Sequence, residues 1–174
     1  MRLQIDNWRW QGVPFYLRSG KQLKEKLTQI TIQFKEPPHL LFPSAKERLT
    51  PNMLVLYLQP DEGVHWRFEA KVPDTIAETR SVDMEFHYAD SFGKTAIPES
   101  YERLLLDTIS GEASLFTRAD EVETAWGLID PILETWNASR KNQPIALYEP
   151  GSWGPSESDE LLAGEKRKWS TRSK

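Results

Sequence analysis

Positively charged side chains gather in one short stretch near the start of the chain. Four of them fall within nine residues: Arg18, Lys21, Lys24 and Lys26. The stretch follows a short apolar segment at 13–17, and Gly20 allows the backbone to turn closely there. Lysines on such a loop can bind a phosphate group as point charges. The alternative is a solvated loop whose lysines keep the protein soluble.

A second group of polar side chains alternates with apolar ones in two segments that are predicted to pair as strands. The group is His65, Arg67, Glu69, Asp83, Glu85 and His87. A carboxylate beside a histidine can perform acid–base chemistry. The same alternation is typical of any half-buried sheet, so an exposed face or a subunit contact is the alternative.

Several classes of site are excluded by what the sequence lacks. It has no cysteine, which removes disulfides and thiolate metal sites and favours a reducing compartment. No glycine-rich phosphate motif, closely spaced histidine pair or Gly-x-Ser-x-Gly elbow occurs. We therefore expect no metal site and no self-sufficient enzyme of a common class.

Length and charge limit the classes of protein that remain. The chain has 174 residues, with 22 Lys and Arg against 26 Asp and Glu, giving a net charge of −4. One domain of this length can bury roughly 70% of its unfolded surface. The acidic balance argues against nucleic acid as a partner, and no apolar run is long enough to span a membrane. We expect a cytoplasmic protein without a signal peptide.

Strands are predicted over the first two-thirds of the chain. Period-two alternation predicts a half-buried strand at 28–34. The continuous apolar run 53–58 favours a strand buried on both faces. Segments 53–59 and 63–71 form a predicted antiparallel hairpin across a Pro-Asp-Glu-Gly turn. A further strand is expected at 81–88. Three strands with one polar face each imply a mostly antiparallel sheet.

Helical spacing replaces this alternation in the last third. A helix is expected from about 100 to Gly111. A longer one is expected from Thr117 onward, with Thr117 as its N-cap and Asp120 reaching back toward the Thr117 amide. An apolar stripe on the second helix includes Trp126 and Trp136, which we expect to be core residues. Pro131 should kink or split that helix. The predicted fold class is α+β, with a large mostly antiparallel sheet and helices packed on one face.

The remaining segments have no strong periodicity. Four prolines interrupt 35–52, which is too many for a regular element. Only a short helix near 156–163 is expected after Asn142. The basic tail 166–174 contains Trp169 and could touch RNA or a membrane, but such tails are more often solvated or disordered.

Motifs spread along the chain carry a resemblance to one enzyme family. They are DNWRWQGVPFYLRSGK at 6–21, QPDE at 59–62, YERLLLD at 101–107, AW at 125–126, GSWGP at 151–155 and ELL at 160–162. Together they resemble glucose-6-phosphate dehydrogenase, in the family's order, from about residue 4 to 169. The resemblance is to the C-terminal domain over residues 1–174. The NADP-binding Rossmann domain of the family, with its catalytic histidine, is absent from this chain.

This resemblance implies a function for the charged loop. The family oxidises D-glucose 6-phosphate to 6-phosphogluconolactone with NADP+, the first step of the oxidative pentose phosphate pathway. In its Arg-(Thr or Ser)-Gly-Lys motif the lysine binds the sugar phosphate, and here that residue is Lys21. The second cation five residues later is Lys26, and the glutamine of the Gln-Pro turn is Gln59. The resemblance assigns no catalytic residue to this chain, so we expect it to be inactive alone.

Two further expectations follow from the resemblance. Some family members hold a second, structural NADP on this domain through basic residues. Here Leu27, Thr31 and Tyr57 stand at such positions and Trp153 replaces an arginine, so we expect no structural NADP although Arg18 is retained. The family also assembles through its sheet, which implies a homodimer or homotetramer. The alternative function is a stand-alone protein-interaction module that uses the sheet face.

Overall fold

The computed structural model describes residues 1–37, 50–93, 97–139, 145–165 and 167–171. The chain divides into two compact units. The first contains residues 1–24 and 98–169, and the second contains 25–97 and 170–174. Most of the loop expected at 35–52 and most of the tail's lysines lie outside the described residues.

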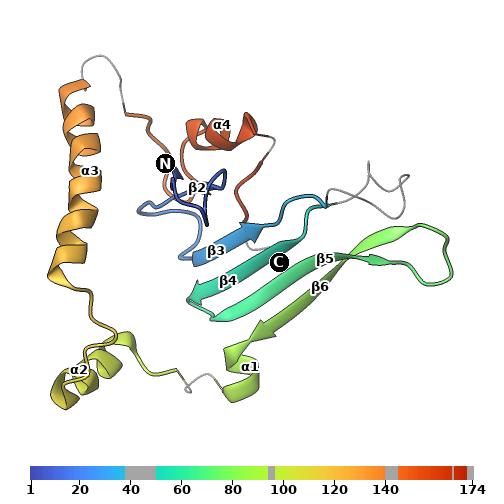
Figure 1. Cartoon of the computed structure of the whole chain (residues 1–174), viewed down its shortest axis with the longest axis horizontal. Coiled ribbons are helices and arrows are strands. Elements are labelled where there is room, and N and C mark those ends of the chain that lie inside the picture. Colours follow the sequence, from blue (N-terminus) through green and yellow to red (C-terminus); the bar gives the residue numbers. More distant parts are fainter. Residues whose placement is uncertain (38–49, 94–96, 140–144, 166, 172–174) are drawn as a thin grey trace. The chain divides into compact units, whose positions relative to one another are not determined.

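The second unit is built on a four-stranded antiparallel sheet. Its strands are β3 (Thr28–Gln33), β4 (Met53–Gln59), β5 (Gly63–Lys71) and β6 (Thr79–His87), in the order β3-β4-β5-β6 (Figure 1). β4 and β5 form the predicted hairpin, with Tyr57 opposite Gly63. A short helix, α1 (Tyr88–Phe92), follows β6 directly. The prediction of an antiparallel sheet is confirmed.

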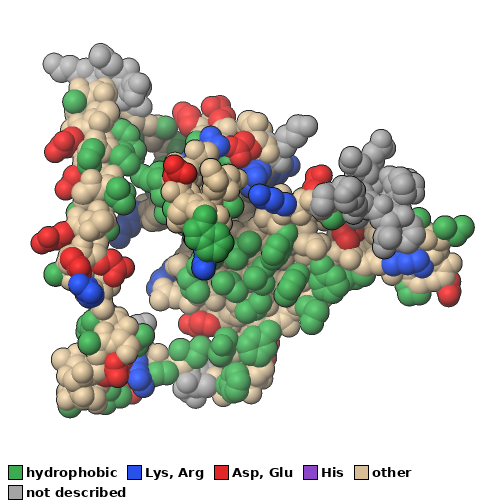
Figure 2. Space-filling model, viewed as in Figure 1, with side chains coloured by type: hydrophobic (Ala, Val, Ile, Leu, Met, Phe, Trp, Pro, Cys, Tyr) green, Lys and Arg blue, Asp and Glu red, His purple; other side chains and the backbone are tan. Residues whose placement is uncertain are grey.

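The two faces of this sheet differ sharply in exposure. On one face Val55 and Tyr57 are buried, beside His65. The other face carries apolar side chains that remain in contact with solvent: Ile30, Ile32, Trp66, Met84 and Phe86. Figure 2 shows hydrophobic side chains gathered over these strands. The expectation that β4 is buried on both faces is therefore wrong for this chain, because nothing within the described segments fully covers the apolar face.

The first unit contains a short strand pair and three helices. β1 (Arg2–Gln4) pairs antiparallel with β2 (Pro14–Tyr16). The helices are α2 (Ser100–Ser110), α3 (Ala119–Ser139) and α4 (Glu157–Ala163). These helices and the antiparallel sheets place the chain in the predicted α+β class. Leu162 of α4 is the buried apolar residue of this unit among those described.

The structure of α3 differs from the burial expected for its tryptophans and from a split at Pro131. Trp126 and Trp136 are 55% and 59% exposed rather than core residues, because within the described chain no element covers their stripe. The helix also continues through Pro131 without a break. A proline removes one backbone hydrogen bond from a helix, and the bonds on either side are enough to keep this long helix continuous.

Candidate functional site: the Lys21 loop

The loop after β2 is anchored at its start by backbone contacts. The amino group of Met1 donates a hydrogen bond to the Leu17 carbonyl, at 2.8 Å. This bond extends the β1–β2 pairing by one step, since Arg2 lies opposite Tyr16. The charged segment 18–24 therefore leaves a fixed strand end.

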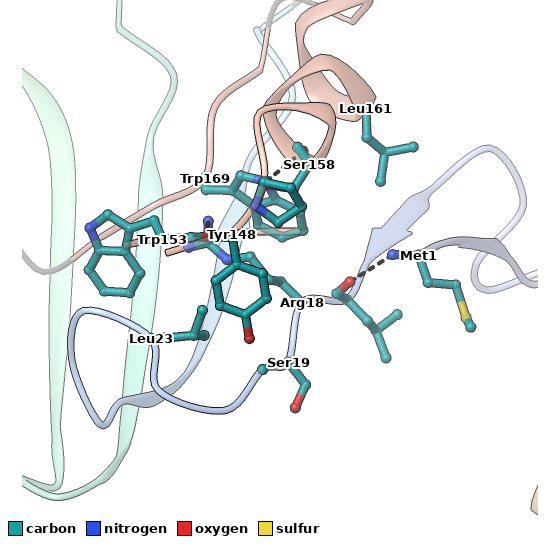
Figure 3. A pocket seen from close by; sticks show the side chains of 13 residues that line it. Met1, Arg18, Ser19, Leu23, Tyr148, Trp153, Ser158, Leu161 and Trp169 are labelled. Atoms are coloured by element: carbon teal, nitrogen blue, oxygen red, sulfur yellow. Dashed lines mark hydrogen bonds between the residues drawn. The ribbon is translucent and has the colours of Figure 1, made fainter. Parts of the chain in front are cut away.

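Arg18, the first cation of the loop, is held between two indole rings. Its guanidinium carbon lies 5.2 Å from the ring centre of Trp153 and 4.6 Å from that of Trp169 (Figure 3). Burial lowers the pKa of Arg18, and the nearby Asp159 carboxylate partly opposes this shift. Cation–π contacts of this kind stabilise by about 0.5–2 kcal/mol each. Arg18 thus packs against the two indole rings, unlike the exposed lysines of the same loop.

Trp169 is fixed from a second direction. Its indole Nε1 donates to the Ser158 carbonyl at 2.8 Å, which ties the end of the chain to α4. The expectation of a solvated or disordered tail is therefore wrong at this residue. A cavity of about 220 Å³ adjoins the two indoles and Arg18, lined also by Leu17, Leu23, Tyr148 and Leu161 (Figure 3).

The segment 148–152 holds the backbone of the Lys21 loop at three places. The Tyr148 hydroxyl donates to the Lys21 carbonyl at 2.7 Å. The Gly151 amide donates to the Gln22 carbonyl at 2.9 Å, and the Lys24 amide donates to the Ser152 carbonyl at 2.9 Å. Segments separated by more than 120 residues in sequence thus form one structure around Lys21.

The side chains of Lys21 and Lys24 remain available to solvent on this fixed backbone. Both residues are exposed, and neither forms an ion pair with any residue that the structure describes. An ammonium group that is not engaged by a carboxylate can form a charge-assisted hydrogen bond to a ligand anion. The loop therefore meets the chemical requirement for phosphate binding at Lys21.

Lys26 and Gln59 lie in the second unit, at one end of its sheet. Thr28, at the start of β3, stands opposite Gln59 at the end of β4. Lys26 precedes Thr28 by two residues, so the cation and the amide come from the same end of the β3–β4 pair. Both are exposed, and Lys26 has no ion-pair partner in the part of the chain that is described.

A group of side chains around His87, which sequence analysis did not connect with Gln59, occupies the same end of the sheet. His87 Nδ1 lies 3.1 Å from Asp61 Oδ2, and His87 Nε2 lies 2.9 Å from Glu85 Oε1. The ring stacks on Tyr57 at 6.2 Å between centres. Asp61 belongs to the turn after β4, so pairing of β4, β5 and β6 was needed to find this group.

The alternating polar residues of β5 and β6 form an internally paired group. Asp83 Oδ1 accepts from Arg67 Nε at 2.8 Å and lies 2.7 Å from His65 Nε2. The hydrogen bonds from Arg67 and His65 lower the pKa of Asp83. Ser81 likewise donates to Glu69 across the two strands. Because its polar atoms bind one another, this group supports the structural interpretation and not the acid–base one.

Among the residues described, no three His, Asp or Glu side chains are placed so that they could hold one metal ion. No helix in the described part of the chain is long and apolar enough to cross a membrane. Neither Tyr148 nor Gly151 was singled out by sequence analysis for contact with the Lys21 loop. The only signal was that Gly151 belongs to the GSWGP motif.

Comparison with known proteins gives the chain a family. The family model described as glucose-6-phosphate dehydrogenase, C-terminal domain, matches residues 1–170. Glucose-6-phosphate 1-dehydrogenase 2 of Mycobacterium tuberculosis (strain ATCC 25618 / H37Rv) is 48% identical over 168 residues, covering 96% of this chain and 32% of the relative. Glucose-6-phosphate 1-dehydrogenase of Aggregatibacter actinomycetemcomitans is 44% identical over 169 residues, covering 97% and 33%.

Solved structures agree with these relatives. The crystal structure of glucose-6-phosphate 1-dehydrogenase from Mycobacterium avium matches with a TM-score of 0.76 and 33% identity, covering 98% of this chain and 34% of that one. A glucose-6-phosphate dehydrogenase in complex with its substrate glucose-6-phosphate matches with a TM-score of 0.80 and 30% identity, at 98% and 34% coverage. The chain thus spans about a third of the length of these proteins, and it belongs to the family of glucose-6-phosphate dehydrogenase C-terminal domains.

Proposed function

We propose that this chain acts as the C-terminal domain of a glucose-6-phosphate dehydrogenase. The complete enzyme would oxidise D-glucose 6-phosphate to the lactone and transfer the hydride to NADP+. This domain would supply part of the sugar-phosphate site and the subunit interface, and it would be inactive alone. The observation that carries the proposal is the family match over residues 1–170, which includes the Lys21 loop.

Lys21, Lys26 and Gln59 are the proposed substrate-binding residues. A sugar phosphate carries up to two negative charges near neutral pH, and two lysines can oppose them as point charges. The Gln59 amide can both donate and accept hydrogen bonds, which suits sugar hydroxyl groups. Support comes from the exposure of all three residues and from the absence of ion-pair partners for the two lysines among the described residues.

The NADP that accepts the hydride is proposed to bind to the part of the enzyme outside this chain. The residues here do not suit a second NADP. Arg18 is enclosed by Trp153 and Trp169, and Leu27 and Thr31 carry no charge. Tyr57 is buried and stacked on His87. We therefore propose no structural NADP on this domain.

A second copy of the chain is the proposed partner for the apolar face of the sheet. That face leaves Trp66 46%, Met84 64% and Ile30 49% exposed, and extended apolar patches mark interaction surfaces. A homodimer or homotetramer would cover it. Membership of an enzyme family favours this over the stand-alone interaction module. The proposed location is the cytoplasm, in keeping with a chain that lacks cysteine.

Replacement of Lys21 in the complete enzyme tests the proposal. Lys21→Ala removes a charge-assisted contact to the phosphate, so we expect the KM for glucose 6-phosphate to rise by roughly 10- to 100-fold. The KM for NADP+ should change less than about twofold. Lys71→Ala, which removes an exposed lysine from the end of β5, is the matched control and should behave as wild type. Equal increases in both KM values for Lys21→Ala would contradict the assigned role.

A further inference from the structure

We infer that Tyr148 is a positioning residue for phosphate recognition, acting through the backbone of Lys21. This inference rests on the proposed function of Lys21 and extends it to a residue in a distant part of the sequence. Tyr148 lies 127 positions along the chain from Lys21, and its hydroxyl donates to the Lys21 carbonyl at 2.7 Å. This distance is that of a well-formed O–H···O hydrogen bond.

The Tyr148 hydroxyl also packs closely against Gly20, the residue before Lys21. A Cβ placed on Gly20 would lie 3.1 Å from the Tyr148 hydroxyl oxygen and 3.2 Å from the Leu23 side chain. A side chain at position 20 would therefore press on the hydroxyl and on the Lys21 carbonyl that it holds. The glycine of the Arg-Ser-Gly-Lys sequence thus makes room for the hydroxyl of Tyr148.

The loop needs such a support because its backbone is strained one residue later. Gln22 has a φ of +53°, in the left-handed region that residues with a side chain rarely adopt. Such a conformation persists only where the surroundings fix it. Here the Gly151 amide holds the Gln22 carbonyl, and the Ser152 carbonyl holds the Lys24 amide.

Of these three hydrogen bonds from segment 148–152, only that of Tyr148 comes from a side chain. It can therefore be removed without changing the backbone of either segment. Lysine has a flexible stem, so the reach of its ammonium group depends on where the backbone places Cα. A displacement of about 1 Å at a binding group can cost up to roughly 100-fold in rate. Loss of the hydrogen bond to the Lys21 carbonyl should thus weaken recognition of the phosphate group and leave recognition of the sugar ring unchanged.

The experiment compares two substrates of the complete enzyme, glucose 6-phosphate and glucose. The measured quantity is the ratio of their kcat/KM values, which isolates recognition of the phosphate. Tyr148→Phe should lower this ratio about fivefold, as expected for the loss of one ordinary hydrogen bond. The activity with glucose and the KM for NADP+ should change less than about twofold. Gly20→Ala should lower the ratio in the same direction.

Tyr16→Phe is the matched control. It makes the same chemical change in the same unit, because the Tyr16 hydroxyl donates to Glu165, but that bond does not touch the Lys21 loop. We expect it to lower the unfolding temperature and to leave the substrate ratio unchanged. A role of Tyr148 in general stability alone would give the two variants the same behaviour in both measurements.

The outcomes distinguish the positioning role of Tyr148 from the phosphate-binding role of Lys21 on which it rests. If Lys21→Ala lowers the ratio at least tenfold while Tyr148→Phe and Gly20→Ala leave it unchanged, the positioning role is overturned and the function of Lys21 stands. If Lys21→Ala itself leaves the ratio unchanged, the proposed phosphate site fails. Should Tyr148→Phe not fold, an unchanged ratio in Gly20→Ala overturns the inference by itself.

Discussion

At the scale of single residues, cations of the charged loop that look alike in the sequence have different surroundings in the structure. Arg18 and Lys21 are three residues apart, yet one is enclosed by indoles and the other is exposed. The sequence could predict the concentration of charge but not this division. The partners that enclose Arg18 lie at 153 and 169, and only the folded chain brings them to position 18.

The enclosure of Arg18 leads to a prediction about nucleotide stoichiometry. Under the proposal that this domain holds no structural NADP, equilibrium dialysis of the complete enzyme against NADP+ should show one site per chain at micromolar concentration. Arg18 is enclosed by indole rings, and Leu27, Thr31 and Tyr57 carry no positive charge. Each missing cation removes a contact of about 1.5–3 kcal/mol. Two micromolar sites per chain would contradict the prediction. The Lys21→Ala variant is the control, because a second site that it retains cannot be NADP+ bound at the sugar-phosphate site.

At the scale of elements, Gly63 allows an unusually close approach of two strands. A Cβ at this position would lie 2.4 Å from the Phe86 carbonyl oxygen, so Gly63→Ala must push β5 away from β6. We expect a loss of about 1–3 kcal/mol of stability, measured as the free energy of unfolding in urea. Gly127→Ala in α3 meets open space and is the matched control, with an expected gain of about 0.5–1 kcal/mol. Equal stabilities for the two variants would contradict this account.

The strands were predictable because side-chain alternation directly reports which face each residue occupies. The segment 63–71 was predicted with the bounds that β5 has. α1 was missed, since Tyr88 continues the alternation of β6 even though the backbone turns helical there. The aromatic cluster that holds this turn, with Phe86 and Tyr88 at 5.1 Å and Tyr88 and Phe92 at 5.7 Å, depends on three-dimensional contacts.

The same limit applies to the start of α3. Sequence spacing suggested Thr117 as a cap with Asp120 reaching back toward its amide. In the structure the Asp120 carboxylate instead accepts from the Arg118 guanidinium, at 3.1 and 2.7 Å. A charged neighbour two residues away outcompetes the capping bond.

At the scale of the whole chain, few of the apolar side chains that the structure describes are buried. Among the described residues the buried apolar side chains are Val55, Tyr57 and Leu162. A chain of this length can form an ample core, but within each unit few of the described apolar side chains are buried. The apolar face of the sheet and the stripe of α3 are surfaces that a larger assembly would cover. Sequence patterns identify such surfaces as apolar but do not say which partner covers them.

The proposed assembly through the sheet gives a prediction at this scale. Trp66→Glu in the complete enzyme places a charge on the apolar face, so light scattering after size exclusion should show dissociation to a smaller species. Lys71→Glu, at the end of the same strand, is the control and should keep the wild-type mass. A Trp66→Glu protein with the wild-type mass would contradict an interface on this face.

The central claim is that Lys21 binds the phosphate of the sugar substrate. A crystal structure of the complete enzyme with glucose 6-phosphate would test it most directly, through the distance from Lys21 Nζ to the nearest phosphate oxygen. We predict a charge-assisted hydrogen bond of about 2.7–2.9 Å, with the Tyr148 hydroxyl still on the Lys21 carbonyl. A phosphate bound elsewhere, with the Lys21 ammonium group in solvent, would contradict the account.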